Sequence, residues 1–116
     1  MLPLSSQSRF SLYTHPTDMR KSFDGLQGIV TNHLNRNPLS GEVFIFINKR
    51  RDRIKMLVWD RNGFWLFYKR LEQGRFQELL PTAGKDINIS YDTLVMLLEG
   101  IDLKRIKRRK RYPKSA

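Results

Sequence analysis

The 116-residue chain suits one compact domain, and its hydrophobic fraction of 40% and charged fraction of 28% exclude a disordered chain. It has no cysteine, which excludes disulfides and thiolate zinc sites, and no apolar run near the roughly 20 residues that span a bilayer, so we expect a cytoplasmic protein without a membrane partner. Its 22 Lys and Arg against 11 Asp and Glu give a net charge of +11, a surplus typical of proteins that bind a polyanion such as nucleic acid.

The N-terminal part predicts a short strand followed by a helix. Residues 9–13 alternate between apolar and polar side chains, as a strand does. From about residue 18 to 35, apolar residues recur at three- and four-residue spacing, which predicts an amphipathic helix. Thr17 or Asp18 is expected to cap its N-terminus by accepting hydrogen bonds from free backbone N–H groups.

Three strands are predicted to follow one another in an antiparallel meander. The unbroken apolar run over residues 42–48 is typical of a central strand that is covered on both faces. The strands 53–60 and 64–71 come next along the chain. They are joined by a turn at Asn62-Gly63, because Asn-Gly tolerates the positive φ angles of a type I′ turn.

Side chains alternate between the two faces of this hairpin. A two-residue loop at Asn62-Gly63 would pair Val58 with Phe67. One face is predicted to belong to the core whatever the protein does, and it carries Ile54, Met56, Val58, Trp65 and Phe67. The other face is apolar in the middle and basic at its edges, with Lys55, Leu57, Trp59, Arg61, Phe64, Leu66, Tyr68 and Arg70.

The second face of the hairpin has two interpretations. In the first, the predicted helices bury both faces and the cations lie at the edges of the buried surface. We favour this interpretation because small domains rarely expose a large apolar patch without a partner. In the second, the face is open to solvent, so that Trp59, Phe64 or Tyr68 stacks on bases while Arg61 and Arg70 contact phosphates. A protein partner would cover the same residues equally well.

The C-terminal part predicts a further strand and a second helix. A short strand is expected at 87–90, and Ser90 can cap a helix over about 91–100 that ends at Gly100. The fold class is therefore a small single α+β domain over residues 1–103. Its meander of three to five strands, centred on 42–71, packs with the two helices. Residues 104–116 form a basic tail, either a frayed helical extension or a free segment.

Two basic segments are the candidate nucleic-acid-binding sites, because Lys and Arg neutralise phosphates and release counterions without reading sequence. The first is the tail, with Lys104, Arg105, Lys107, Arg108, Arg109, Lys110 and Arg111. The second is a predicted turn, with Lys49, Arg50, Arg51 and Arg53. The alternative for both is a solvated charge run that aids solubility.

No catalytic residue, metal site or cofactor is predicted. The only histidines, His15 and His33, lie outside any metal-binding spacing, and no phosphate-binding glycine loop is present. A metal-dependent nuclease is a minor alternative that would require carboxylates such as Asp18, Asp24 and Asp60 to converge from separate elements.

Three segments together resemble one protein family. They are "TDMRKSFDGL" (17–26), the stretch 37–76 that contains "WDRNGFWLFYKRLEQGRF", and "LLEGIDLKRIKRRKRY" (97–112). The chain resembles the TnpB-type accessory protein encoded by the second open reading frame of the insertion-sequence-sixty-six group of bacterial transposons. The resemblance implies an accessory role in DNA transposition, beside a separate larger transposase that carries the acidic catalytic residues.

The sequence and the resemblance together support three hypotheses. The first is a non-catalytic accessory protein that binds DNA, such as the transposon ends, through its basic segments. The second is an interaction module that docks on the transposase of the same element. The third is an RNA-binding protein, which shares every charge argument with the first.

Overall fold

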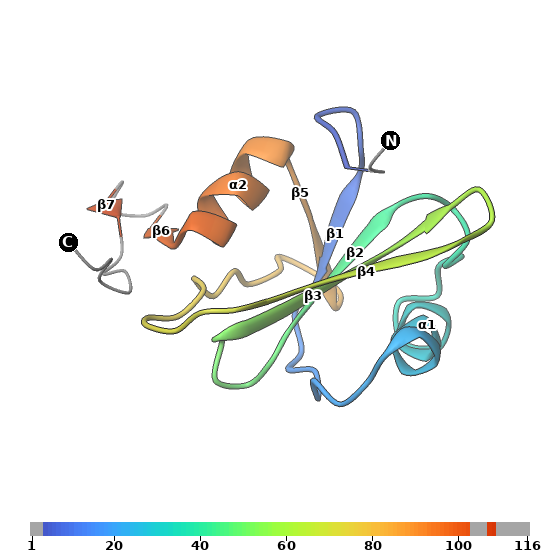
Figure 1. Cartoon of the computed structure of the whole chain (residues 1–116), viewed down its shortest axis with the longest axis horizontal. Helices are drawn as coiled ribbons and strands as arrows, with labels where there is room; N and C mark the ends of the chain where they lie inside the picture. The colour runs from blue at the N-terminus through green and yellow to red at the C-terminus, as the bar shows by residue number, and fades with distance from the viewer. Residues whose placement is uncertain (1–3, 103–106, 109–116) are drawn as a thin grey trace.

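A five-stranded sheet lies between two helices in the computed structural model (Figure 1). The structure describes residues 4–102 and the backbone of 107–108, with side chains up to Gly100. The elements, in chain order, are β1 (Phe10–Tyr13), α1 (Phe23–Asn32), β2 (Val43–Ile47), β3 (Arg53–Asp60), β4 (Gly63–Arg70), β5 (Asp86–Ile89), α2 (Tyr91–Glu99), β6 (Ile101–Asp102) and β7 (Lys107–Arg108). This arrangement confirms the predicted small α+β domain.

The strand order of the large sheet is β4-β3-β2-β1-β5. The antiparallel meander from β2 to β4 is confirmed, with β2 in the middle of the sheet. β1 pairs with β2 in parallel, because α1 carries the chain back across the sheet between the two strands. β5 then adds to the free side of β1 in the antiparallel sense. The sequence did not predict this parallel pair.

Each face of the sheet has its own hydrophobic core. On one face α2 packs through Leu94 and Leu97 onto a cluster that also contains Phe10, Leu12, Val43, Ile45, Ile54, Met56, Val58 and Phe76. On the other face α1 packs through Leu26, Ile29 and Val30 onto Phe44, Phe46 and Leu57. Both faces of β2 are therefore buried, as its unbroken apolar sequence predicted.

Helix α1 is shorter than predicted and is not capped by Thr17 or Asp18. The Asp18 carboxylate instead accepts hydrogen bonds from the backbone N–H and the guanidinium of Arg20. Lys55, which is buried on the α1 face, donates from Nζ to the carbonyl oxygens of Met19 (2.8 Å) and Lys21 (2.7 Å). These two bonds tie residues 19–21 to β3, and α1 begins only at Phe23.

The β3–β4 hairpin turns one residue earlier than predicted. Asp60 pairs with Gly63, so the loop consists of Arg61 and Asn62, with Arg61 at a φ of 57°. Val58 is consequently opposite Trp65 rather than Phe67. The assignment of residues to faces is unchanged, because the pairing moves by an even number of residues.

The prediction that Trp65 lies in the core is wrong. Trp65 is 43% exposed, while Phe67 on the same face packs partly against the α2-side core. β4 is an edge strand, and at its start the Trp65 indole only stacks on Phe67 (centroids 6.0 Å apart) and donates from Nε1 to the Asp60 carboxylate at 3.1 Å. A strand at the border of a sheet has a neighbour on one side alone, so its side chains are less covered.

Helix α2 has the predicted ends. Ser90 Oγ accepts a hydrogen bond from the Thr93 backbone N–H, and Gly100 terminates the helix with a φ of 75°. After Gly100 the chain does not continue as a helix: β6 pairs with Lys107–Arg108 (β7) in a two-stranded antiparallel ladder. Neither α1 nor α2, nor any other helix in the described ranges, has the length and apolar character to cross a membrane.

Candidate nucleic-acid interface

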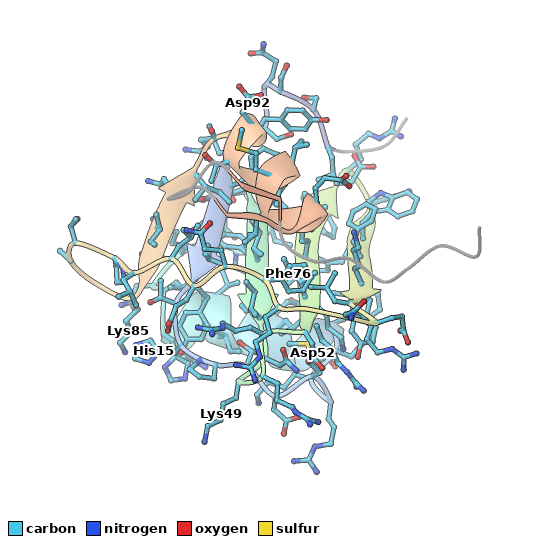
Figure 2. All side chains as sticks on the ribbon, turned by 90° about the vertical axis from the view of Figure 1, so that its left-hand side faces the viewer. His15, Lys49, Asp52, Phe76, Lys85 and Asp92 are labelled. Carbon is cyan, nitrogen blue, oxygen red and sulfur yellow. The ribbon has the colours of Figure 1, made fainter. Side chains whose placement is uncertain are left out.

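One end of the large sheet gathers positively charged side chains from separate loops. We call it the basic end and define it by the cations Lys49, Arg50, Arg51, Arg53, Arg75 and Lys85, with the imidazole of His15 beside them. His15 follows β1, and Lys49 and Arg50 follow β2, whose parallel pairing places both exits at the same end. Figure 2 shows Lys49, His15 and Lys85 together at this end, with Asp92 at the opposite end of the molecule.

The β2–β3 turn is held by the side chain of Asn48. Its Oδ1 accepts hydrogen bonds from the backbone N–H groups of Asp52 and Arg53, both at 3.0 Å. Its Nδ2 donates to the Asp52 carboxylate at 2.7 Å, and Arg51 adopts a φ of 58° to close the turn. The tip of the turn is therefore fixed, with Lys49 and Arg50 exposed on it.

The four predicted cations of the turn are not equivalent. Arg51 forms an ion pair with Glu78 at 2.7 Å, and Arg53 donates from Nη1 to the Tyr68 hydroxyl at 3.3 Å. Lys49 and Arg50 make no side-chain hydrogen bond or ion pair with any residue between 4 and 100. They are the two cations of the turn that are free to meet an external anion.

Folding brings further cations to the turn that the sequence did not indicate. The Phe76 backbone N–H donates to the Arg51 carbonyl at 2.7 Å, which places Arg75 beside the turn. The Thr14 backbone N–H donates to the Lys85 carbonyl at 2.9 Å, which places Lys85 beside His15. Arg75 and Lys85 lie in the turn-rich stretch 72–86, whose only clear structural signal is the aromatic Phe76, buried in the core.

Most carboxylates near the basic end are neutralised by neighbouring arginines. Hydrogen bonds from Arg20 hold the pKa of the Asp18 carboxyl at about 2, well below its usual range. Glu72 bonds to Arg70 at 2.7 Å and raises the pKa of that guanidinium. Glu78 pairs with Arg51. The excess positive charge is consequently left to the exposed side chains of Lys49, Arg50, Arg75 and Lys85.

The second face of the hairpin does not form a stacking platform. Trp59 and Phe64 are half-buried and pack edge-to-face with ring centroids 5.1 Å apart, and Phe64 also contacts the α1-side core. Tyr68 is 53% exposed, and the Lys55 ammonium lies 4.8 Å from the centre of its ring.

The predicted cations of this face lie apart from each other. Arg61 is in the hairpin turn, and Arg70 is at the far end of β4, about 20 Å away for a strand of this length. Only Tyr68 and Arg70 are near the basic end. The five predicted residues Trp59, Arg61, Phe64, Tyr68 and Arg70 are thus not brought together as one surface.

The predicted tail site falls largely outside the described residues. This holds for Lys104, Arg105, Arg109, Lys110 and Arg111. For Lys107 and Arg108 the structure describes the backbone of β7 alone. The nucleic-acid-binding role of the basic tail stays a prediction from the sequence.

Within the part of the chain that the structure describes, no three His, Asp or Glu side chains converge as a metal site would require. Asp18, Asp24 and Asp60, considered for a nuclease centre, belong to three separate segments: the loop before α1, the first turn of α1 and the end of β3.

The described residues form a small α+β domain with one basic end. The family model described as "IS66 Orf2 like protein" matches residues 8–108, and the chain belongs to this family. The family supports an accessory role in transposition.

Two curated proteins of Sinorhizobium fredii (strain NBRC 101917 / NGR234) are similar to the chain over most of their length. The protein named "Uncharacterized protein y4jC" is 33% identical over 109 residues, which cover 94% of this chain and 92% of that protein. "Uncharacterized protein y4hO" is 41% identical over 103 residues, which cover 88% of each chain. No solved structure matches.

Proposed function

We propose that this protein serves transposition by binding DNA in the cytoplasm, through the basic end of the sheet and the basic tail. The observation that carries the proposal is the fixed β2–β3 turn, which presents Lys49 and Arg50 without an internal partner. A turn whose backbone is already fixed loses little backbone entropy when its two exposed cations meet a phosphate. The arrangement favours contacts to the backbone of the nucleic acid, which give affinity and orientation rather than sequence readout.

Replacing Lys49 and Arg50 together with alanine is expected to weaken binding to a duplex from the transposon end by about tenfold near physiological salt. Two lost phosphate contacts should also reduce the slope of log K against log salt by about 1.8. Fluorescence anisotropy over a series of salt concentrations measures both quantities. Competition with single-stranded RNA in the same assay separates DNA binding from RNA binding.

The matched control is the double variant Arg9→Ala, Arg61→Ala. Both arginines are exposed and lie at the opposite end of the sheet, so the variant removes the same charge from a different place. It is expected to lower affinity far less. Equal losses in the two double variants would mean that net charge alone determines binding and that the turn is not a site.

A second candidate function, docking on the transposase, is favoured by the exposed aromatic residues of β4. This edge strand offers unpaired backbone groups next to Trp65 and Tyr68, and an extended partner segment adds to such an edge. The double variant Trp65→Ala, Tyr68→Ala is expected to abolish co-purification with the transposase after nuclease treatment. Leu39→Ala, at a residue that is 50% exposed in a loop, is the control. Co-purification that survives the double variant would remove β4 as the docking surface.

A further inference from the structure

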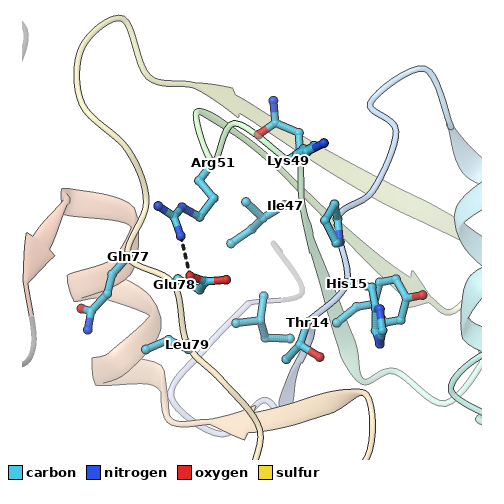
Figure 3. Close-up of a pocket in the computed structure, with 12 residues that line it drawn as sticks. Thr14, His15, Ile47, Lys49, Arg51, Gln77, Glu78 and Leu79 are labelled. Atoms are coloured by element: carbon cyan, nitrogen blue, oxygen red, sulfur yellow. Dashed lines mark hydrogen bonds and ion pairs between the residues drawn. The ribbon is translucent and has the colours of Figure 1, made fainter.

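A small pocket opens at the carboxyl ends of β1 and β2, between the exposed cations of the basic end (Figure 3). After β1 the chain leaves through Thr14 and His15 toward α1, and after β2 it leaves through Asn48 into the turn. Two adjacent parallel strands whose continuations diverge leave a crevice at their ends. The segment 77–79 closes the crevice from the third side.

The pocket has an apolar floor and a polar rim. Leu12, Ile47 and Leu79 supply the floor. The rim contains Asn48, the ion pair between Arg51 and Glu78, and the exposed imidazole of His15, whose ring lies 5.5 Å from that of Tyr13. Lys49 stands at the mouth. An apolar bottom below hydrogen-bonding groups fits a flat ring with polar edges better than it fits a bare anion.

The volume limits the ligand to one small group. The pocket measures about 100 Å³. Drug-sized ligands need about 300 Å³ or more, whereas a cavity of about 150 Å³ holds one benzene ring. The pocket is therefore too small for a whole ring, and only the edge of a planar ring would enter it, with the rest of the ring lying at the mouth.

We propose that the pocket takes the edge of one unpaired nucleobase of the bound nucleic acid. The base would rest on the aliphatic floor and stack against His15, and its edge would meet the ion pair of Arg51 and Glu78. The neighbouring phosphates would lie on Lys49 and Arg50. This inference rests on the proposed nucleic-acid binding and adds a preference to it. A base within an intact duplex is stacked and paired and cannot enter, so the protein distinguishes a frayed or overhanging end from continuous duplex.

The surroundings of the pocket indicate that it binds one base rather than a run of successive bases. Proteins that bind long single strands offer successive aromatic rings as stacking platforms. Here the aromatic side chains that line the pocket are Tyr13 and His15, whose rings lie 5.5 Å apart, and Trp59 and Phe64 are half-buried on the far part of the sheet. Tyr68 is exposed on β4 but does not line the pocket. The ligand is thus an end or a single displaced nucleotide on a duplex.

The test compares a blunt duplex with the same duplex carrying a short single-stranded overhang that contains 2-aminopurine. The unmodified protein is expected to bind the overhang duplex about fivefold or more tightly than the blunt one. The fluorescence of 2-aminopurine is expected to change when the base leaves its neighbours and enters the pocket. Leu79→Trp, which fills the pocket, should abolish both the preference and the fluorescence change.

Leu80→Trp is the matched control, because Leu80 is the next residue and is 73% exposed outside the pocket. It should keep the preference and the fluorescence change. Equal affinity of the unmodified protein for both duplexes, or an unchanged fluorescence signal, would overturn the base pocket while leaving salt-dependent duplex binding intact. An equal loss of affinity for both duplexes in Leu79→Trp would also overturn the base pocket, since such a loss would indicate that the pocket binds phosphate. Absence of any duplex binding by the unmodified protein would instead contradict the proposed function.

Discussion

Replacing Arg36 with methionine is expected to lower the free energy of unfolding by about 3 kcal/mol, because the change leaves the buried carboxylate of Glu42 and the partly buried one of Asp86 without their cation. Arg36 follows α1, and its guanidinium bonds to Glu42 through Nη1 (2.5 Å) and to Asp86 through Nη2 (2.7 Å). The Ser11 hydroxyl donates to the same Asp86 carboxylate at 2.7 Å. Arg36 therefore joins the exit of α1 to the start of β2, to β1 and to β5.

The burial of the carboxylates decides the size of this effect. Glu42 is only 6% exposed, so its charge without Arg36 would be poorly solvated. The guanidinium itself is partly exposed, with 32% of its side-chain surface accessible, which keeps the expected loss at the lower end of the range for buried pairs.

Urea denaturation followed by circular dichroism measures the change in unfolding free energy. Arg9→Met is the control, because it removes an exposed arginine near the same strands and should cost less than about 0.5 kcal/mol. Similar stability of the two variants would show that the Arg36 network does not hold β5 and β2 together. The double variant Glu42→Gln, Arg36→Met should recover part of the loss, since it removes one of the carboxylates left unpaired.

The local pattern of the sequence predicted the elements well where one signal was sufficient. The apolar run of β2 identified a central strand, and Ser90 and Gly100 fixed both ends of α2. The start of α1 was missed because it depends on Lys55, a residue more than 30 positions away whose ammonium binds the carbonyls of Met19 and Lys21. No pattern within the helix itself contains that information.

The exposure of Trp65 is a second feature that the local sequence could not predict. Its alternation with Phe67 assigned it correctly to the α2 face, but alternation does not say whether a strand is central or at an edge. The position of β4 at the border of the sheet is a property of the whole topology. Exposure of Trp65 follows from that position and not from its neighbours in sequence.

The residues of the candidate site also differ in whether the local sequence could predict them. The cations Lys49 and Arg50 are adjacent in the sequence and could be predicted, although their freedom from partners could not. Arg75 and Lys85 reach the basic end only because Phe76 inserts into the core and β5 pairs with β1. The pocket depends on the parallel pairing of β1 with β2, which no local signal indicated.

Removing residues 104–116 is expected to lower duplex affinity about a hundredfold near physiological salt, the largest effect on binding among the variants considered. The segment contains eight of the 22 Lys and Arg residues of the chain. Each phosphate contact that is lost should reduce the slope of log K against log salt by about 0.9. The fall in slope therefore counts how many of the eight cations contact the duplex, independently of the absolute affinity.

Two controls separate this effect from loss of folding and from sequence readout. Among the described residues, both hydrophobic cores are built from the stretch between Leu4 and Leu98, so the urea midpoint of the shortened protein is expected to stay close to that of the full chain. A variant with the same tail residues in shuffled order should bind as the full chain does, because phosphate contacts carry no sequence information. Unchanged affinity after the deletion would exclude the tail and leave the basic end as the sole site.

Adding the tail back as a separate peptide tests whether tail and domain act on one duplex. If both contact the same molecule, a tail joined to the domain binds at an effective concentration in the millimolar range. A separate peptide of the same sequence, added at micromolar concentration, should then fail to restore binding to the shortened protein. Full restoration by the peptide would mean that the tail binds DNA on its own and that the domain contributes no duplex contact near it.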